Sequence, residues 1–192
     1  MTTPAAPEPV ERPGSRTAGA LALLRGLGAE RIPHPGGTLL AHLVRVEALL
    51  ASWGARPELR LAGLCHAAYG TDGFATALLP VGRRADLAAV IGDGAEAIAY
   101  LYAGCDRSAS YPLLTAGTAA FRDRFTGRVH SPDPGVRRDF AELTAANELD
   151  LARTDPAFRS AYGPDLRELF DRWRGLLSGP ALRECRAVLA DA

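Results

Sequence analysis

The sequence predicts an all-α protein with a single domain. Apolar residues recur at the three- and four-residue spacing of amphipathic helices along most of the chain. No alternating run is long enough to predict a strand of useful length, and no internal repeat is visible. With 192 residues, the chain is long enough to form one hydrophobic core.

The first helix follows a tail of different composition. Residues 1–15 are rich in proline and polar residues and lack apolar periodicity, which predicts a disordered N-terminal tail. One helical domain is expected over residues 16–192. Its first helix begins at Thr17 and ends at a glycine near residues 26–28, and the run Pro35-Gly36-Gly37 then breaks the chain.

The next two helices are expected to form an antiparallel pair. Thr38 is a good N-cap for the first, which runs to Trp53 and stops at Gly54. Its apolar stripe consists of Leu39, Leu43, Val46, Leu50 and Trp53. The second spans residues 58–70 and is apolar nearly all round, so a buried position is predicted. Because the connecting turn is short, the two helices should pack side by side.

The remaining helices follow the same pattern, apart from one ambiguous stretch. Glycine and proline interrupt residues 106–134 so often that no element is predicted there. The other predicted helices span residues 83–92, 93–105, 135–153, 165–179 and 180–192.

Composition limits the partners and the chemistry. The formal net charge is zero, which favours neither nucleic acid nor an acidic membrane surface. No run reaches the roughly 18 apolar residues of a membrane span, and no signal peptide is recognisable, so a cytoplasmic protein is expected. Every basic residue is arginine, so no lysine is available for a Schiff base. Three cysteines without short pairing motifs predict neither a disulfide framework nor a zinc ribbon.

Two histidines are the main candidates for chemistry. His42 and His66 are predicted on the inward faces of the paired helices, and His34 lies in the loop just before them. Two facing imidazoles can share a metal ion or act as an acid/base pair. Alternatively, each histidine donates to a backbone carbonyl and helps to fill the core.

The late helix contributes a polar residue that is also predicted to point inward. Asn147 is the only asparagine in the chain, and it is in register with the apolar residues of its helix. A buried amide needs hydrogen-bond partners, so Asn147 is either a catalytic residue facing the histidines or a polar contact with a loop. Asp150, one turn further on, is expected at the rim on the solvent side.

Three further residues are predicted around the same site. Tyr69 is expected to share a helix face with His66, where its phenol could donate a proton. Asp72 lies in a loop flanked by glycines, where it could reach the mouth of the site. His34, Asp72 and Trp53 are the predicted substrate contacts.

Three stretches of the chain resemble a known superfamily of helical proteins. The stretch "HLVRVEALLASWGARPELRLAGLCHA", with "AVIGDGAEAIAYLYAGCD" and "ELTAANELDLA", resembles the HD-domain superfamily of helical metal-dependent phosphohydrolases. The likeness is closest to the hydrolase domain of the alarmone enzymes and to an uncharacterised bacterial family within the superfamily. It implies an HD-like helical bundle in which His42 and His66 occupy metal-ligand positions and Asn147 occupies the place of the last ligand.

The chain departs from that family at its acidic residues. Ala67 stands where the family has the aspartate of its His-Asp pair, and Asn147 replaces the late aspartate. Gly70 and Thr71 stand where the alarmone hydrolases have an acidic pair. Because hard divalent cations prefer anionic oxygen ligands, ordinary phosphohydrolase activity is not expected.

Three functions are compatible with these departures. In the first, the protein is an enzyme that acts on a small organic molecule, for example in a biosynthetic tailoring step. Acid/base chemistry would then come from His42 and His66 with Tyr69 or Asn147, without a cofactor. In the second, His34, His42 and His66 bind one transition metal ion such as iron, copper or zinc. In the third, the protein is a catalytically inactive ligand-binding or regulatory module.

Overall fold

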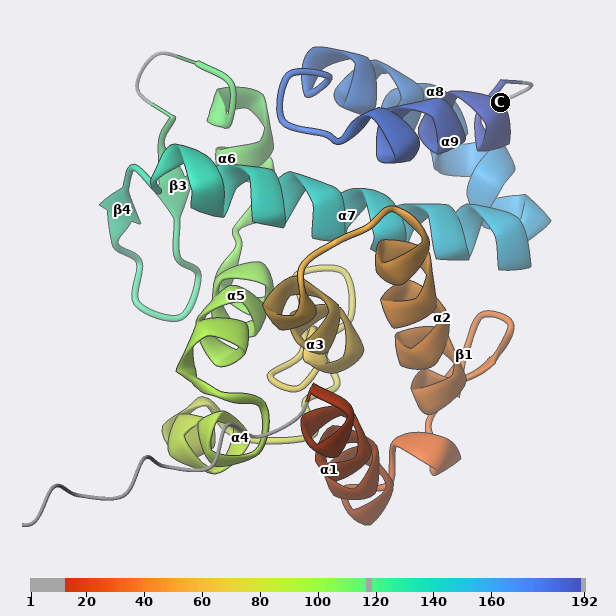
Figure 1. Ribbon diagram of the computed structural model, residues 1–192. Helices are drawn as coiled ribbons and strands as arrows, with labels where there is room; N and C mark the ends of the chain where they lie inside the picture. The colour runs from red at the N-terminus through yellow and green to blue at the C-terminus, as the bar shows by residue number, and fades with distance from the viewer. Residues whose placement is uncertain (1–12, 117–118, 191–192) are drawn as a thin grey trace, which may run out of the picture.

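The long helix α7, Pro134–Thr154, runs through the middle of the molecule in the computed structural model, which describes residues 13–116 and 119–190 (Figure 1). Nearly every residue from Phe140 to Ala152 is buried, because helices pack on more than one side of α7. One layer of helices lies below α7 in Figure 1 and another lies above it. The chain forms a single, predominantly α-helical domain, as predicted.

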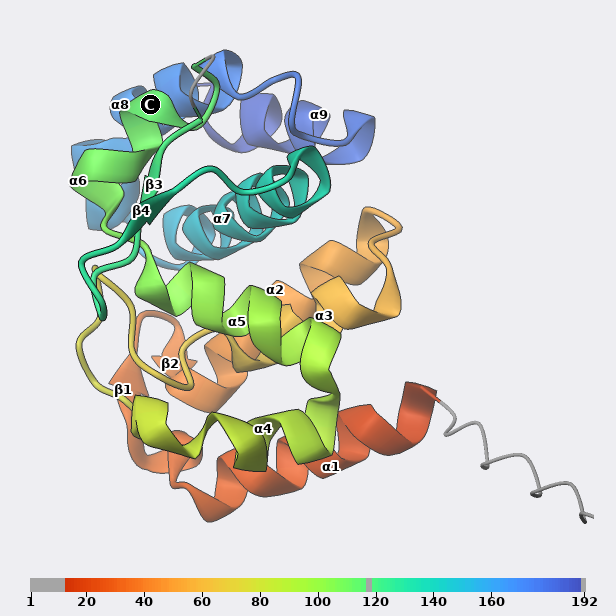
Figure 2. The same ribbon diagram turned by 90° about the vertical axis from the view of Figure 1, so that its left-hand side faces the viewer.

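The lower layer carries the paired helices of the predicted site. Here α2 and α3 pack against each other, and both contact α7. The helices α1 and α4 lie at the bottom of this layer and contact α3, and α5 lies beside α3 and above α4 (Figures 1 and 2). The helices of this layer are α1 (Pro13–Gly26), α2 (Leu39–Ser52), α3 (Pro57–Cys65), α4 (Arg84–Ile91) and α5 (Asp93–Gly104).

The upper layer consists of the short α6 and the last two helices. The helices α8 and α9 pack on α7 and on each other, and α8 accommodates Pro164 in its interior. The bounds of these helices are α6 (Arg107–Ser110), α8 (Pro156–Arg172) and α9 (Gly179–Val188).

Two short antiparallel hairpins complete the fold, and the sequence predicted neither of them. In the first, β1 (Pro33–His34) pairs with β2 (Gly37–Thr38), and the hairpin leads directly into α2. In the second, β3 (Phe121–Arg122) pairs with β4 (Val129–His130) beside α5. Each strand has only two residues, which is too short for an alternating pattern to be recognised.

Several predicted boundaries are confirmed. Thr38 caps α2, because its side-chain oxygen accepts a hydrogen bond from the N–H of Ala41. Gly54 ends that helix with a positive φ of 78°. Gly92 separates α4 from α5. Among the described residues, no helix is both long enough and apolar enough to cross a bilayer.

Other boundaries differ from the prediction. Residues 1–12 of the predicted tail lie outside the described residues, and the first helix begins at Pro13 instead of Thr17. The third helix ends at Cys65 instead of Gly70. After Cys65 the helical hydrogen bonds give way to turns in which the N–H of Ala68 donates to Cys65, and the carbonyl of Ala68 accepts from the N–H groups of residues 78–79. Gly70 then turns the chain with a φ of 69°.

Gly63 sets the distance between α2 and α3. A methyl group at this position would overlap the Cδ1 atom of Leu50, which is fully buried on the facing helix. With a larger residue here, the buried side chain of Leu50 or the spacing of the two helices has to shift.

We expect Gly63→Ala to lower the free energy of unfolding by about 1–3 kcal/mol, because the added methyl group overpacks the contact with Leu50. Chemical denaturation measures the change. Gly135→Ala is the matched control, since a Cβ atom on this glycine of α7 meets no atom within 4 Å. The control should unfold at an unchanged or slightly higher denaturant concentration. Equal stability of the two variants would contradict this account of the helix contact.

Candidate functional site

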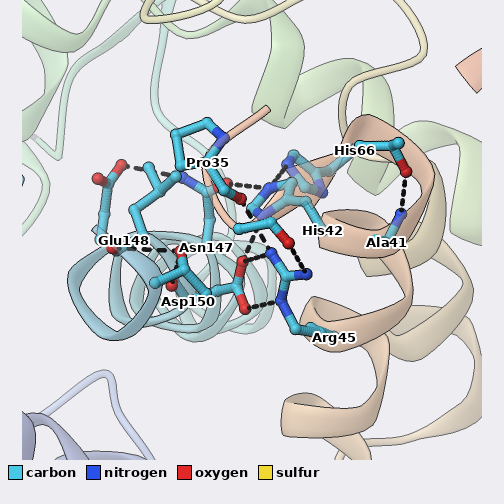
Figure 3. A network of polar contacts seen from close by, with 12 residues as sticks. Pro35, Ala41, His42, Arg45, His66, Asn147, Glu148 and Asp150 are labelled. Carbon is cyan, nitrogen blue, oxygen red and sulfur yellow. Dashed lines mark hydrogen bonds and ion pairs between the residues drawn. The ribbon is translucent and has the colours of Figure 1, made fainter. Parts of the chain in front are cut away.

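His42 is held between α2 and α7. Its ring is 1% exposed, and its Nδ1 atom donates to Oδ2 of Asp150 over 2.6 Å (Figure 3). Arg45, one turn further along α2, donates from Nε to Oδ1 of the same carboxylate over 2.6 Å and from Nη2 to Oδ2 over 2.9 Å. The carboxylate therefore fixes the orientation of the imidazole, and it balances the charge of the arginine.

His66 is held by the end of its own helix. Its Nδ1 atom lies 2.8 Å from the carbonyl oxygen of Gly63. Because a carbonyl only accepts hydrogen bonds, Nδ1 of His66 must carry the proton, and Nε2 then has a free lone pair. The ring of Tyr102 meets the imidazole edge to face at 5.2 Å and closes this side of the site.

Three acceptor atoms meet between these anchored rings. Nε2 of His42 lies 3.4 Å from Nε2 of His66 and 3.0 Å from Oδ1 of Asn147. The amide of Asn147 is oriented by its Nδ2 atom, which donates to Glu148 over 3.1 Å. Lone pairs that face one another repel, so a positive charge, either a proton or a metal ion, is needed between them.

The pKa values of His34 and His66 are low enough to keep both rings neutral at neutral pH. Burial, followed by the charge of His42, lowers the pKa of His66 to about 3. Burial and His42 also lower the pKa of His34 to about 4. Burial alone would raise the pKa of Asp150, but the hydrogen bonds from His42 and Arg45 outweigh it and lower that pKa below its usual range. At neutral pH the site thus contains neutral His34 and His66 beside an ionised Asp150.

The hairpin β1–β2 covers the pair of histidines. The ring of His34 is stacked on His42, with centroids 4.1 Å apart, and it meets Phe74 edge to face at 5.4 Å. Its Nδ1 atom is buried and has no hydrogen-bond partner among the described residues. Arg45 holds the hairpin in place by donating to the carbonyl oxygens of Pro35 and Gly36.

A series of charged side chains connects Asn147 to the surface. Glu148, 4% exposed, accepts from Nη1 of Arg107 over 2.9 Å, and Nη2 of the same guanidinium lies 3.3 Å from the hydroxyl of Tyr102. The backbone N–H of Arg107 donates to the exposed Asp72 over 3.0 Å. Asp72 therefore lies at the outer end of this series of side chains, not beside the imidazoles.

The structure thus gathers His34, His42, His66 and Asn147 but places Tyr69 and Trp53 elsewhere, as it does Asp72. Tyr69 donates to Glu96 over 2.8 Å, in a separate cluster, because the third helix ends before it and the expected helical register with His66 is lost. Trp53 lies eleven residues after His42 on α2, which separates them by about 16 Å along the helix axis. Its indole N–H donates to Glu184 of α9.

The ligand set predicted from three histidines is not formed. His34 lies flat against His42 and does not direct a nitrogen to the point where His42, His66 and Asn147 meet. Across residues 13–116 and 119–190, no three His, Cys, Asp or Glu side chains form a metal-binding group. The third converging donor is the amide oxygen of Asn147.

The most important residue that the sequence analysis misplaced is Asp150. It was expected at the solvent rim, but it is 4% exposed and anchors His42. Arg45 was not singled out at all. The spacing could have indicated both, since Asp150 follows Asn147 by three residues and Arg45 follows His42 by three, which places each pair on one helix face.

The comparisons with known proteins add a partial family match. A family model described as a domain of unknown function (DUF6817) matches residues 23–107. This stretch contains His34, His42 and His66, whereas Asn147 and Asp150 lie beyond it. No curated protein matches the chain, and no solved structure does.

We expect Asp150→Ala to lower the free energy of unfolding by about 3–5 kcal/mol, because the buried His42 and the guanidinium of Arg45 lose their shared acceptor. The matched control is Asp86→Ala, which removes an exposed ion pair with Arg83 and should cost less than about 1 kcal/mol. Thermal and denaturant unfolding of both variants measure the difference. If Asp150→Ala lowers the free energy of unfolding no more than Asp86→Ala does, the carboxylate of Asp150 does not anchor the site.

Proposed function

We propose that the protein is an enzyme that acts on a small organic molecule, and that its centre is a transition-metal site formed by His42, His66 and Asn147. The observation that carries the proposal is the convergence of Nε2 of His42, Nε2 of His66 and Oδ1 of Asn147. These positions correspond to those of the metal ligands in the HD-domain resemblance. The same convergence is what a bound cation requires.

The hydrogen bonds that orient the three candidate ligand groups support this proposal. Metal-binding histidines in proteins usually donate their second ring nitrogen to a carboxylate or a backbone carbonyl. His42 does so to Asp150, and His66 does so to Gly63. The low pKa of His66, about 3, also keeps its nitrogen available as a ligand at neutral pH.

The chemistry of the donors favours a particular class of metal. Two imidazoles and an amide oxygen carry no charge, and imidazole suits zinc, iron and copper better than magnesium or calcium. A bound metal of this kind supplies Lewis acidity. The negative charge nearest to the three donors is that of Asp150, which acts on the site through His42.

Substrate is proposed to approach from the side of the β1–β2 hairpin. His34 is only partly exposed there, and its buried Nδ1 atom has no partner in the described part of the chain. A polar group of a substrate can satisfy this atom once the hairpin moves. Phe74, packed against His34, offers an apolar surface beside it.

A metal-free acid/base enzyme is the second candidate. It is favoured by the short contact of 2.6 Å between His42 and the buried Asp150, since a carboxylate that orients an imidazole is a common feature of general-base sites. In this case a proton on Nε2 of His42 occupies the place of the metal and is shared with Asn147.

Elemental analysis distinguishes the two candidates. After reconstitution with Zn²⁺, Fe²⁺ or Cu²⁺ and removal of the excess, we expect about one equivalent of metal in the wild-type protein and none in His66→Ala. His130→Ala is the matched control, because that histidine is exposed on β4 and should leave the metal content unchanged. Circular dichroism verifies that each variant is folded.

Two results would contradict the metal site. If the wild-type protein retains no metal under any of these conditions, the acid/base candidate replaces it. If His66→Ala retains as much metal as the wild type, the metal lies elsewhere. As a positive variant, Asn147→Asp should increase the affinity for Mn²⁺, since it replaces a neutral oxygen with an anionic one.

A further inference from the structure

A cavity lies on the other side of α5 from the histidines. Its volume is about 370 Å³, which is within the range of sites for small organic molecules. It is bounded by the outer face of α5, by the β3–β4 hairpin and by the first turns of α7 (Figure 1). No residue of the histidine site lines it.

The walls of this cavity combine small and apolar side chains. Gly94, Ala97 and Gly104 of α5 form part of the wall and have side chains too small to fill the space. The rings of Phe121 and Tyr100 line it as well. The small side chains leave space for an apolar molecule beside these rings.

Further apolar side chains and one histidine complete the lining. The apolar residues are Ile98, Leu101 and Val136. His130 is exposed on β4, its ring packs against Phe121 with centroids 5.4 Å apart, and no polar partner for it is found among the described residues. It is therefore available for one hydrogen bond to a ligand.

The charged groups of the cavity are already paired with other residues. Arg56 is bonded to Asp139 and to Glu58. Arg84 is bonded through two nitrogens to Glu96, and its guanidinium lies over the ring of Tyr100 at 3.7 Å.

Asp123 is paired in the same way. It accepts from the hydroxyl of Tyr100 over 2.8 Å and from the backbone N–H of Phe125 over 2.8 Å. An ionic ligand would have to displace one of these partners, and a neutral ligand would not. The charge distribution thus favours an uncharged ligand.

We propose that this cavity is a binding site for a small, uncharged, apolar molecule. The site is independent of the proposed metal centre, because α5 separates the two. Tyr102 on the inner face of α5 contacts His66, whereas Tyr100 and Leu101 face the cavity. The ligand packs against the partly exposed side chains of Tyr100, Leu101 and Val136 and accepts or donates one hydrogen bond at His130.

Titration with the neutral fluorescent probe N-phenyl-1-naphthylamine tests the proposal. Ala97 is exposed on α5 and lines the cavity, so Ala97→Phe fills the site without disturbing the core. Ala161→Phe is the matched control, because Ala161 is exposed on α8 and does not line the cavity. Thermal melts verify that both variants remain folded.

We expect saturable binding with one probe per chain in the wild type and in Ala161→Phe, and at least a tenfold weaker affinity in Ala97→Phe. His130→Ala should weaken the binding of a hydroxylated ring such as 2-naphthol more than that of naphthalene. Absence of saturable binding in the wild type would overturn the proposal. Equal affinity in Ala97→Phe and the control would also overturn it. Neither result depends on whether the protein binds a metal, so this proposal and the metal-site proposal are tested independently.

Discussion

The central constraint in this protein is that three hydrogen-bond acceptors face one another in a buried space. Nε2 of His42, Nε2 of His66 and Oδ1 of Asn147 meet with separations of 3.0 Å and 3.4 Å from His42. None of them can turn away, because the opposite atom of each group is already engaged, by Asp150, Gly63 and Glu148 respectively. This arrangement is stable only with a positive charge at its centre.

The fold supplies the three anchors from elements far apart in the sequence. Helix α7 is buried along most of its length, so its polar residues Asn147, Glu148 and Asp150 have to be satisfied by partners from the surrounding helices. Arg45 satisfies Asp150 from α2 and also fixes the hairpin that carries His34. The helices of the lower layer therefore bring the histidines together and neutralise the charges behind them.

The sequence predicts the helices better than the site. Periodicity, the cap at Thr38 and the glycine stops locate most helices, because these features act locally. His42, His66 and Asn147 could be identified as inward-facing for the same reason. The spacing places Asp150 on the same helix face as Asn147, but its partner Arg45 is far away in the sequence, and so is Glu96, the partner of Tyr69. Helical periodicity alone therefore does not reveal either contact. The two hairpins are too short to leave a pattern.

The protonation of the two rings tests the central claim most directly. Long-range ¹H–¹⁵N correlation spectra of the labelled protein, recorded before and after addition of Zn²⁺, report which nitrogen of each histidine carries a proton. The account predicts protonated Nδ1 and unprotonated Nε2 on both His42 and His66 with zinc present, and a shift of both Nε2 resonances on its addition. A protonated Nε2 on His66, or Nε2 resonances that do not respond to zinc, would contradict it.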